Sequence, residues 1–396
     1  MNDFVLHTPT DFVFGRDAEL KSAEMLKKYG ASKVLVHYGS GSVVKSGLLQ
    51  RVEDNLTGAG IGYVKLGGAV PNPVDTLVYE GIKLCRKEKV DFILAVGGGS
   101  AIDSAKAIAV GVLYDGDFWD YFDRKLTIEK ALPVGTVLTI PAAGSEASNS
   151  MVITRTKGGE ALKRGCGSPE IVPVFALLNP ELNYTLPPFQ TACGAADMMA
   201  HVMERYFTRV ENVEISDRLC EAILLTVIEE TPKAIKNPKD YGARANLTWA
   251  STVAHNDSCG VGRKMGTRIG DWATHHMEHE LSALYGVAHG AGLAVMFPAW
   301  MKYVYETDLD RFVRFAVNVW HVENTGDKKA VALKGIEAME KFFSSIGLPI
   351  NFKELGAKKE DIDKMVKTLN INMGDTIGNF KELTMEDARK IYELAV

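Results

Sequence analysis

The chain has 396 residues, a length that allows two or three domains of ordinary size. Its 50 acidic and 45 basic residues give a net charge of −5, so the basic excess that nucleic-acid binding requires is missing. No apolar run approaches the roughly 20 residues that cross a bilayer, and the first residues lack the pattern of a secretion signal. We therefore expect a cytoplasmic protein whose partners are neither nucleic acid nor membrane.

The first half of the chain alternates short β-branched runs with amphipathic stretches. This alternation predicts a parallel sheet covered by helices. The predicted strands are Lys33–Tyr38, Tyr63–Leu66, Asp91–Val96, Val137–Ile140 and Val174–Leu178. Three helices are predicted between them: one that ends at about Ala59, one from Val74 to about Lys89, and one that begins at Ala101.

The pattern changes near Thr185–Pro188, where two prolines stand together. Consecutive prolines do not fit a helix interior or a central strand, so this segment is the natural domain boundary. Beyond it strand-like runs almost disappear and stretches of helical periodicity continue to the end of the chain. We therefore predict an α/β domain over 1–187 and an all-helical domain over 188–396.

The five cysteines are odd in number and widely scattered, at positions 85, 166, 193, 220 and 259. None belongs to a CxxC pair. This spacing favours reduced, mostly buried thiols over disulfides or a zinc cluster.

Two glycine-containing loops follow predicted strands. The loop Gly97–Ser100 (GGGS) leads into a helix, and its glycines let backbone N–H groups approach an anion at the helix N-terminus. It predicts a pyrophosphate site, and a tight turn without a ligand is the alternative. The earlier loop Gly39–Ser42 (GSGS) begins like a dinucleotide fingerprint but lacks the third glycine, and the strand Tyr63–Leu66 carries no acid. This second loop supports a nucleotide only weakly.

Asp197 and His201 are four residues apart in the predicted helical stretch 189–207. Residues at this spacing project from one helix face about one turn apart. A carboxylate and an imidazole so placed can share a metal ion.

Four of the nine histidines (275, 276, 279 and 289) fall within fifteen residues. His275 and His279 share a helix face, and His289 follows a turn, so two helices can each present an imidazole to the earlier pair. His276 points roughly 100° away from His275, which indicates a structural role.

Any one of these histidines alone is more simply interpreted as a hydrogen-bonded core residue. Together with the Asp197/His201 pair they supply a full metal shell, and this is the interpretation we adopt. Glu278 and Glu280 have suitable side chains but lie off the His275 face, so we expect them to be solvated. His7, His37, His255 and His321 belong to no motif.

These segments, in this order and spacing, resemble the iron-containing alcohol dehydrogenases, which have the dehydroquinate-synthase-like fold. The similarity extends from Phe12 to about Trp320 and is greatest to butanol dehydrogenases and broad-range aldehyde reductases. It is carried by Gly97–Lys106 (GGGSAIDSAK), Ile140–Glu146 (IPAAGSE), Asp197 with His201, and His275 with His279 and His289.

The resemblance implies a role for individual positions. Asp197, His201, His275 and His289 would bind one divalent metal, usually iron and sometimes zinc, and His279 would lie beside the nicotinamide and the substrate as a proton relay. The residues implied around the cofactor are Gly98, Gly99 and Ser100 at the pyrophosphate, Asp103, Thr139 and Lys163 nearby, and Asn72 and Ser42 at the adenosine end. The doubled His275-His276 leaves a one-residue ambiguity, and the spacing to His289 favours His275.

The implied function is a metal-dependent alcohol dehydrogenase that transfers a hydride between NAD(P)H and a small aliphatic aldehyde such as butanal. Residues 1–187 would bind the dinucleotide and 188–396 the metal, and the resemblance suggests a homodimer. A glycerol-dehydrogenase-like or dehydroquinate-synthase-like enzyme of the same fold, and an inactive nucleotide-binding module, are the alternatives.

The turn after the first predicted strand bears on the choice of cofactor. NAD-selective sites usually carry an acid at the adenosine ribose. Here Gly39–Ser42 carries none, and the first acid is Glu53. The hydroxyls of Ser40 and Ser42, with nearby Lys45, can bind a 2′-phosphate. We therefore predict a preference for NADP(H) over NAD(H).

Overall fold

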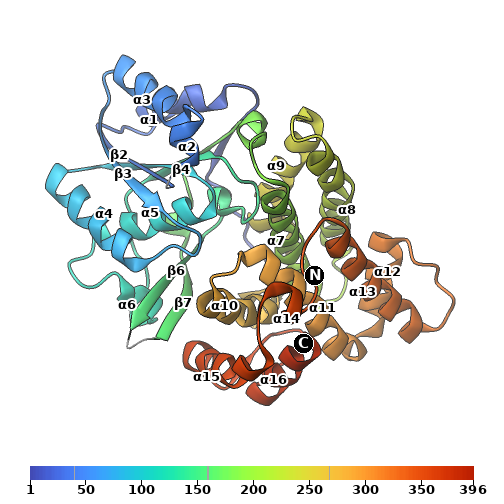
Figure 1. Cartoon of the computed structure of the whole chain (residues 1–396). Helices are drawn as coiled ribbons and strands as arrows, with labels where there is room; N and C mark the ends of the chain where they lie inside the picture. Colours follow the sequence, from blue (N-terminus) through green and yellow to red (C-terminus); the bar gives the residue numbers. More distant parts are fainter. Residues whose placement is uncertain (40, 158–159, 267) are drawn as a thin grey trace. The chain divides into compact units, whose positions relative to one another are not determined.

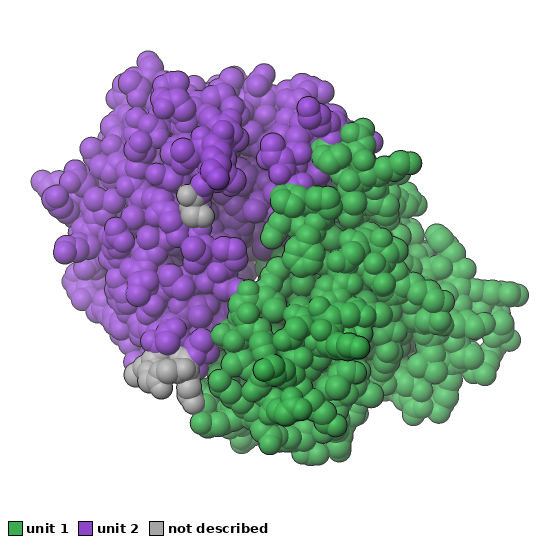
Figure 2. Space-filling view, in the orientation of Figure 1, with its two compact units in different colours: residues 1–6, 187–238, 253–396 green, residues 7–186, 239–252 purple. Residues whose placement is uncertain are grey.

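The computed structural model describes residues 1–39, 41–157, 160–266 and 268–396 (Figure 1). The chain forms two compact units, which Figure 2 colours separately. The sheet unit comprises residues 7–186 and 239–252, and the helical unit comprises residues 1–6, 187–238 and 253–396.

The sheet unit contains a six-stranded parallel sheet with the strand order β1-β8-β5-β4-β2-β3. The predicted α/β class is therefore confirmed. Among the strands, the prediction did not include the edge strand β1 or the separate antiparallel hairpin of β6 and β7. The strands are β1 (Asp11–Phe14), β2 (Lys33–Gly39), β3 (Gly62–Ala69), β4 (Phe92–Gly97), β5 (Val134–Leu138), β6 (Ser150–Lys157), β7 (Glu160–Gly167) and β8 (Phe175–Leu178).

Helices cover both faces of this sheet, so its central strands are buried on both sides. Successive side chains of a strand point to opposite faces, and β4 shows the result: Ile93 joins one apolar core, whereas Phe92 and Leu94 join the other. Residues of α4 and α5 belong to the first core, and residues of α1 and α3 to the second. The helices are α1 (Ser22–Lys28), α2 (Ser42–Lys45), α3 (Leu48–Gly58), α4 (Asp75–Glu88), α5 (Gly99–Val112) and α6 (Trp119–Phe122).

The helical unit is built mainly from helices, as predicted. The prediction that it is all-helical was too strict, because two pairs of two-residue strands, β9 with β10 and β11 with β12, lie in its loops. Its main helices are α7 (Pro188–Tyr206), α8 (Glu214–Lys236), α10 (Ala273–Tyr285), α11 (His289–Val304), α12 (Leu309–Trp320), α13 (Lys328–Ser345), α14 (Phe352–Leu355), α15 (Ile362–Met373) and α16 (Met385–Leu394). The short strands are Lys264–Met265, Arg268–Ile269, Thr376–Ile377 and Leu383–Thr384.

The compact units depart from the predicted boundary at two places. Residues 1–6 group with the helical unit, and residues 239–252, which include most of α9 (Tyr241–His255), group with the sheet unit. Contacts within the sheet unit explain the second departure, since Trp249 packs edge-on against Phe12 with ring centroids 5.4 Å apart and the Thr252 hydroxyl donates to Glu146. Helical periodicity alone does not reveal which core a helix joins.

All five cysteines are free thiols, as the spacing predicted, and all but Cys166 are buried. Desolvation raises the pKa of Cys85, Cys166 and Cys193 to about 12, which keeps these thiols protonated and unreactive at neutral pH. Within the described residues, no helix combines the length and the apolar character needed to cross a membrane.

Candidate metal centre and cofactor loop

Helix α7 carries the first predicted pair. It is buried almost continuously from Thr191 to Tyr206, and Asp197 and His201 face the same way, with His201 Nδ1 3.3 Å from Asp197 Oδ1. Burial, with a smaller contribution from neighbouring histidines, holds the pKa of His201 well below its ordinary value. The ring is therefore neutral, which is the form that binds a metal ion.

The backbones of helices α11 and α7 lie in close contact at Gly290. A Cβ built on Gly290 would lie 2.0 Å from the carbonyl oxygen of Cys193, so only glycine fits at this crossing. His289, the first residue of α11, is thereby brought to α7, and its Nε2 lies 3.8 Å from Asp197 Oδ1.

Helix α10 supplies His275. Among the described residues, the ligand atoms of Asp197, His275 and His289 all lie within 4.8 Å of one another. The fourth predicted ligand, His201, is not part of this group, although its ring lies beside the group with its centroid 4.8 Å from that of His275. His276 does not belong to this group; its ring lies 6.4 Å from that of His279.

The donor chemistry of this cluster fits a divalent metal ion. His275 Nε2 and His201 Nδ1 are buried ring nitrogens without a hydrogen-bond partner in the described part of the chain, an expensive arrangement unless another group binds them. One carboxylate with several imidazoles suits Fe²⁺ and Zn²⁺.

His279 lies one turn beyond His275 on α10, and its ring centroid is 5.6 Å from that of His289. Glu278, His279 and His289 form a second group of possible ligands. However, Nδ1 of His289 is hydrogen-bonded to the Glu278 carboxylate, whereas its Nε2 faces Asp197. The first group is therefore the better metal site.

Sequence reasoning missed the surroundings of four residues in or near the cluster. Glu278 and Glu280 were expected to be solvated, but both are buried, because α10 packs on more than one side. The buried Glu204 of α7 bonds to His275 Nδ1, and His255 stacks on His201 with ring centroids 4.0 Å apart. Only the helical spacing of Glu204 to His201, three residues, hinted at a role for the glutamate.

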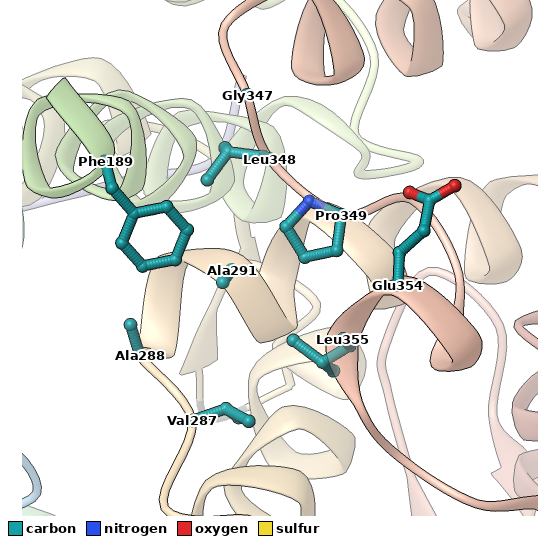
Figure 3. A pocket seen from close by; sticks show the side chains of 9 residues that line it. All are labelled: Phe189, Val287, Ala288, Ala291, Gly347, Leu348, Pro349, Glu354 and Leu355. Atoms are coloured by element: carbon teal, nitrogen blue, oxygen red, sulfur yellow. The ribbon is translucent and has the colours of Figure 1, made fainter.

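A pocket of about 500 Å³ lies in the helical unit close to the start of α11 (Figure 3). Phe189, Val287, Ala288 and Pro349 contribute to a mainly apolar lining. Among the described residues that line the pocket, only Glu354 is charged, and it already accepts hydrogen bonds from Ile350 N and Asn351 Nδ2. None of the predicted metal ligands lines this pocket.

The glycine loop lies at the start of the 14-residue helix α5, in the sheet unit. Gly98 is the N-cap and provides no side-chain cap. A Cβ on Gly98 would meet the Ile140 Cβ at 2.9 Å, and one on Gly99 would meet the Ala143 Cβ at 3.1 Å. Close packing thus accounts for these two glycines. The N-terminus of α5, with Ser100 in its first turn, is also suited to binding an anion.

The other predicted cofactor residues also belong to the sheet unit. Thr139 directly follows β5 and its N–H donates to Gly97 O at 3.0 Å. Ser42 begins α2 and is exposed, and Asn72 has a positive φ of 54° in the turn before α4. Ser40, predicted to assist at the 2′-phosphate, lies outside the described residues.

Asp103 belongs to a buried charged cluster in the sheet unit. Its carboxylate accepts hydrogen bonds from Ser145 Oγ at 2.6 Å and Val152 N at 3.0 Å, and it interacts with the charges of Lys106 and Lys163. Lys106 Nζ donates to the carbonyl oxygens of Ser148 and Ser150. Burial lowers the pKa of Lys106 to about 8, while Asp103 and Glu146 favour its charged form.

We predict that Lys106→Met lowers the free energy of unfolding by about 3–5 kcal/mol, because it removes a buried cation from beside Asp103 and Glu146 and the hydrogen-bond donor of two carbonyl oxygens. Urea titration followed by circular dichroism measures this loss. Lys83→Met, the same change at an exposed position of α4, is the control and should shift the value by less than about 0.5 kcal/mol. Equal stability of the two variants would contradict the prediction.

Comparison with known proteins defines the family. The chain matches the profile of iron-containing alcohol dehydrogenases over residues 9–180 and that of the family's C-terminal part over residues 191–396. It is 40% identical to NADH-dependent butanol dehydrogenase A of Clostridium acetobutylicum over 394 residues, 99% of each chain. It is 38% identical to the NADPH-dependent aldehyde reductase YqhD of Escherichia coli over 100% of both chains.

A solved structure agrees. The crystal structure of NADH-dependent butanol dehydrogenase A from Thermotoga maritima superimposes with a TM-score of 0.95 at 44% identity, covering 100% of this chain and 99% of that one. The chain therefore belongs to the iron-containing alcohol dehydrogenase family, which confirms the resemblance seen in its motifs. It is an NAD(P)-dependent alcohol dehydrogenase.

Proposed function

We propose that this enzyme interconverts small aliphatic aldehydes such as butanal and their alcohols at a single Fe²⁺, with Zn²⁺ as the alternative. The observation that carries the proposal is the convergence of Asp197, His275 and His289 within 4.8 Å in the helical unit. His201, on the same helix face as Asp197 but outside that group, would complete a shell of four. The butanol dehydrogenases and aldehyde reductase to which the chain is similar support this substrate class.

A divalent ion at this centre would supply Lewis acidity toward the substrate oxygen. The protein's own groups would do the rest. Gly98, Gly99 and Ser100 would bind the pyrophosphate at the N-terminus of α5. The cofactor would be held further by Asp103, Thr139 and Lys163, and at its adenosine end by Asn72 and Ser42.

His279 would move the alcohol proton. It is placed one turn from His275 and its ring adjoins that of His289, yet it is surplus to a four-ligand shell. Its imidazole is half-buried, so a proton accepted at the substrate side can pass on toward solvent. The nicotinamide, when bound, would supply the hydride that reduces the aldehyde carbon.

A substrate panel tests the proposal. Iron-reconstituted enzyme should reduce C3 to C6 aliphatic aldehydes with NAD(P)H, and metal-depleted enzyme should not. Metal-loaded enzyme that reduces no aldehyde of the panel would overturn the proposed substrate class. We further propose that the enzyme is a cytoplasmic homodimer. Sedimentation analysis of the purified protein tests whether it is a dimer.

We also propose a preference for NADP(H). The turn after β2 carries no acid, and the first acid that follows, Glu53, is paired with Lys65 at 3.0 Å. An acid at the adenosine ribose would repel a 2′-phosphate, and its absence removes that repulsion. Relatives of similar identity include both NADH-dependent and NADPH-dependent enzymes, so the residues of this turn are the basis of the proposal.

We predict that Gly39→Asp lowers kcat/KM for NADPH by about tenfold or more, because it places a negative charge near the 2′-phosphate. The position accepts a side chain, since a Cβ there would meet only Ala69 O at 3.6 Å. Gly39→Ala is the control and should leave the ratio of NADPH to NADH use almost unchanged. A parent enzyme that clearly prefers NADH, or an Asp variant with undiminished NADPH use, would show that specificity is determined elsewhere.

A further inference from the structure

Two buried glutamates each contact one imidazole of the cluster. Glu204 is 1% exposed, and its Oε1 lies 2.7 Å from His275 Nδ1. Glu278 is 0% exposed, and its Oε2 is hydrogen-bonded to His289 Nδ1. Both contacts therefore use Nδ1 of the ring. In His289 the other nitrogen, Nε2, faces Asp197, and in His275 the other nitrogen, Nε2, has no hydrogen-bond partner in the described part of the chain.

These contacts determine which ring nitrogen carries the hydrogen. An ionised carboxylate can only accept a hydrogen bond, so Nδ1 of each imidazole must be the donor. The lone pair of a neutral ring is then on Nε2. In both rings that atom is the one available to a metal ion, and the carboxylate also makes it a stronger ligand.

Neither carboxylate is free to act as a ligand itself. Glu204 also accepts hydrogen bonds from Trp272 N at 2.5 Å, from His275 N at 3.3 Å and from the Thr274 hydroxyl, all at the start of α10. It thus replaces the side-chain cap that α10 lacks and fixes the helix that carries His275. Glu278 accepts from the Ser282 hydroxyl as well as from His289.

Packing holds Glu278 in place. Gly292 of α11 lies so close that a Cβ there would come 2.6 Å from Glu278 Oε1 and 2.7 Å from its Cγ. The carboxylate is therefore confined between α10 and α11, beside the first turn of the helix that begins with His289.

We propose that Glu204 and Glu278 are positioning residues of the metal centre: they hold His275 and His289 in the tautomer and orientation that direct Nε2 toward the ion. This inference rests on the proposed metal centre. Glu280 provides a comparison, because it is a buried glutamate of the same helix whose Oε1 is bonded to Asn372 Nδ2 at 2.9 Å.

The experiment measures Zn²⁺ binding to the metal-free protein by competition with a chromophoric chelator. Glu278→Ala should weaken binding by about 10- to 100-fold. Glu278→Gln keeps an acceptor oxygen for His289 and should recover a large part of that loss, whereas Glu280→Gln should stay within about threefold of the parent. Thermal unfolding of each metal-free variant verifies that it folds.

Two further variants keep the test decisive. Gly292→Ala retains the carboxylate but displaces it, and should weaken Zn²⁺ binding as Glu278→Ala does. Glu204→Gln should also weaken binding, with a lower melting temperature of the metal-free protein because the start of α10 loses part of its cap. If Glu278→Ala does not fold, Gly292→Ala and Glu278→Gln decide.

The two proposals fail in different ways. A parent protein that binds no stoichiometric Zn²⁺ would overturn the proposed metal centre. A parent that binds Zn²⁺ while Glu278→Ala or Gly292→Ala binds equally tightly would overturn the positioning role alone. Equal losses in Glu280→Gln and Glu278→Ala would show a general effect of buried charge, which also contradicts the inference.

Discussion

Replacing His275 or Asp197 by alanine is expected to remove the bound metal and the dehydrogenase activity together, whereas His276→Ala leaves both in place. Asp197 and His275 lie with His289 in one group of converging ligand atoms, to which His276 does not belong. Loss of one ligand also leaves the remaining buried donors without their partner, so the metal should be lost rather than merely rearranged. Mass spectrometry of metal content, with aldehyde-dependent NAD(P)H oxidation on the same samples, measures both effects.

The His276 variant is the internal control, because it removes an imidazole from the same helix at the adjacent position. Metal content near that of the parent and turnover within about threefold are expected for it. If His276→Ala empties the site while His275→Ala retains metal, the ligand register is displaced by one residue.

His279→Ala should keep its metal and lose turnover by about 10²–10⁴-fold, the usual loss when a proton-transfer group is removed. The ring is near His289 but does not belong to the Asp197, His275 and His289 group. The measurement is kcat for aldehyde reduction across neutral pH on variants with verified metal content.

Two outcomes would separate the possible roles of His279. A variant with full metal and nearly full kcat would remove the residue from the mechanism. If His279→Ala contains no metal, His279 is itself a ligand, and the metal is bound by the second group of side chains, Glu278, His279 and His289. His279→Gln, which keeps a hydrogen-bonding side chain but cannot be protonated near neutral pH, should be nearly as slow as the alanine variant.

Much of the sheet unit was predictable because its strands are continuous β-branched and apolar runs, such as Phe92–Gly97, buried on both faces. The strand β1 (Asp11–Phe14) escaped because it is short and lies at the sheet edge, where its burial is only partial. The β6–β7 hairpin escaped because it pairs outside the main sheet. Both are formed by tertiary contacts that periodicity does not record.

The pairing of Asp197 with His201, and of His275 with His279, could be predicted because helical spacing places residues on one helix face and depends on the local sequence alone. Glu204 is different, since it meets His275 across 71 positions of the chain. Glu278 was assigned to solvent on the assumption that α10 has one buried face, yet both Glu278 and Glu280 are buried beside Met277 and Leu281. Their roles depend on which helices pack together.

The exchange of segments between the units limits how the gene can be divided. The chain passes from one unit to the other between residues 6 and 7, 186 and 187, 238 and 239, and 252 and 253. A fragment ending at the double proline would lack Trp249, the ring that packs on Phe12, and Thr252, the hydroxyl that donates to Glu146. Recombination between family members by one crossover near residue 187 would therefore join an incomplete sheet unit to a foreign segment 239–252. Chimeras that exchange sheet units should carry this segment with them.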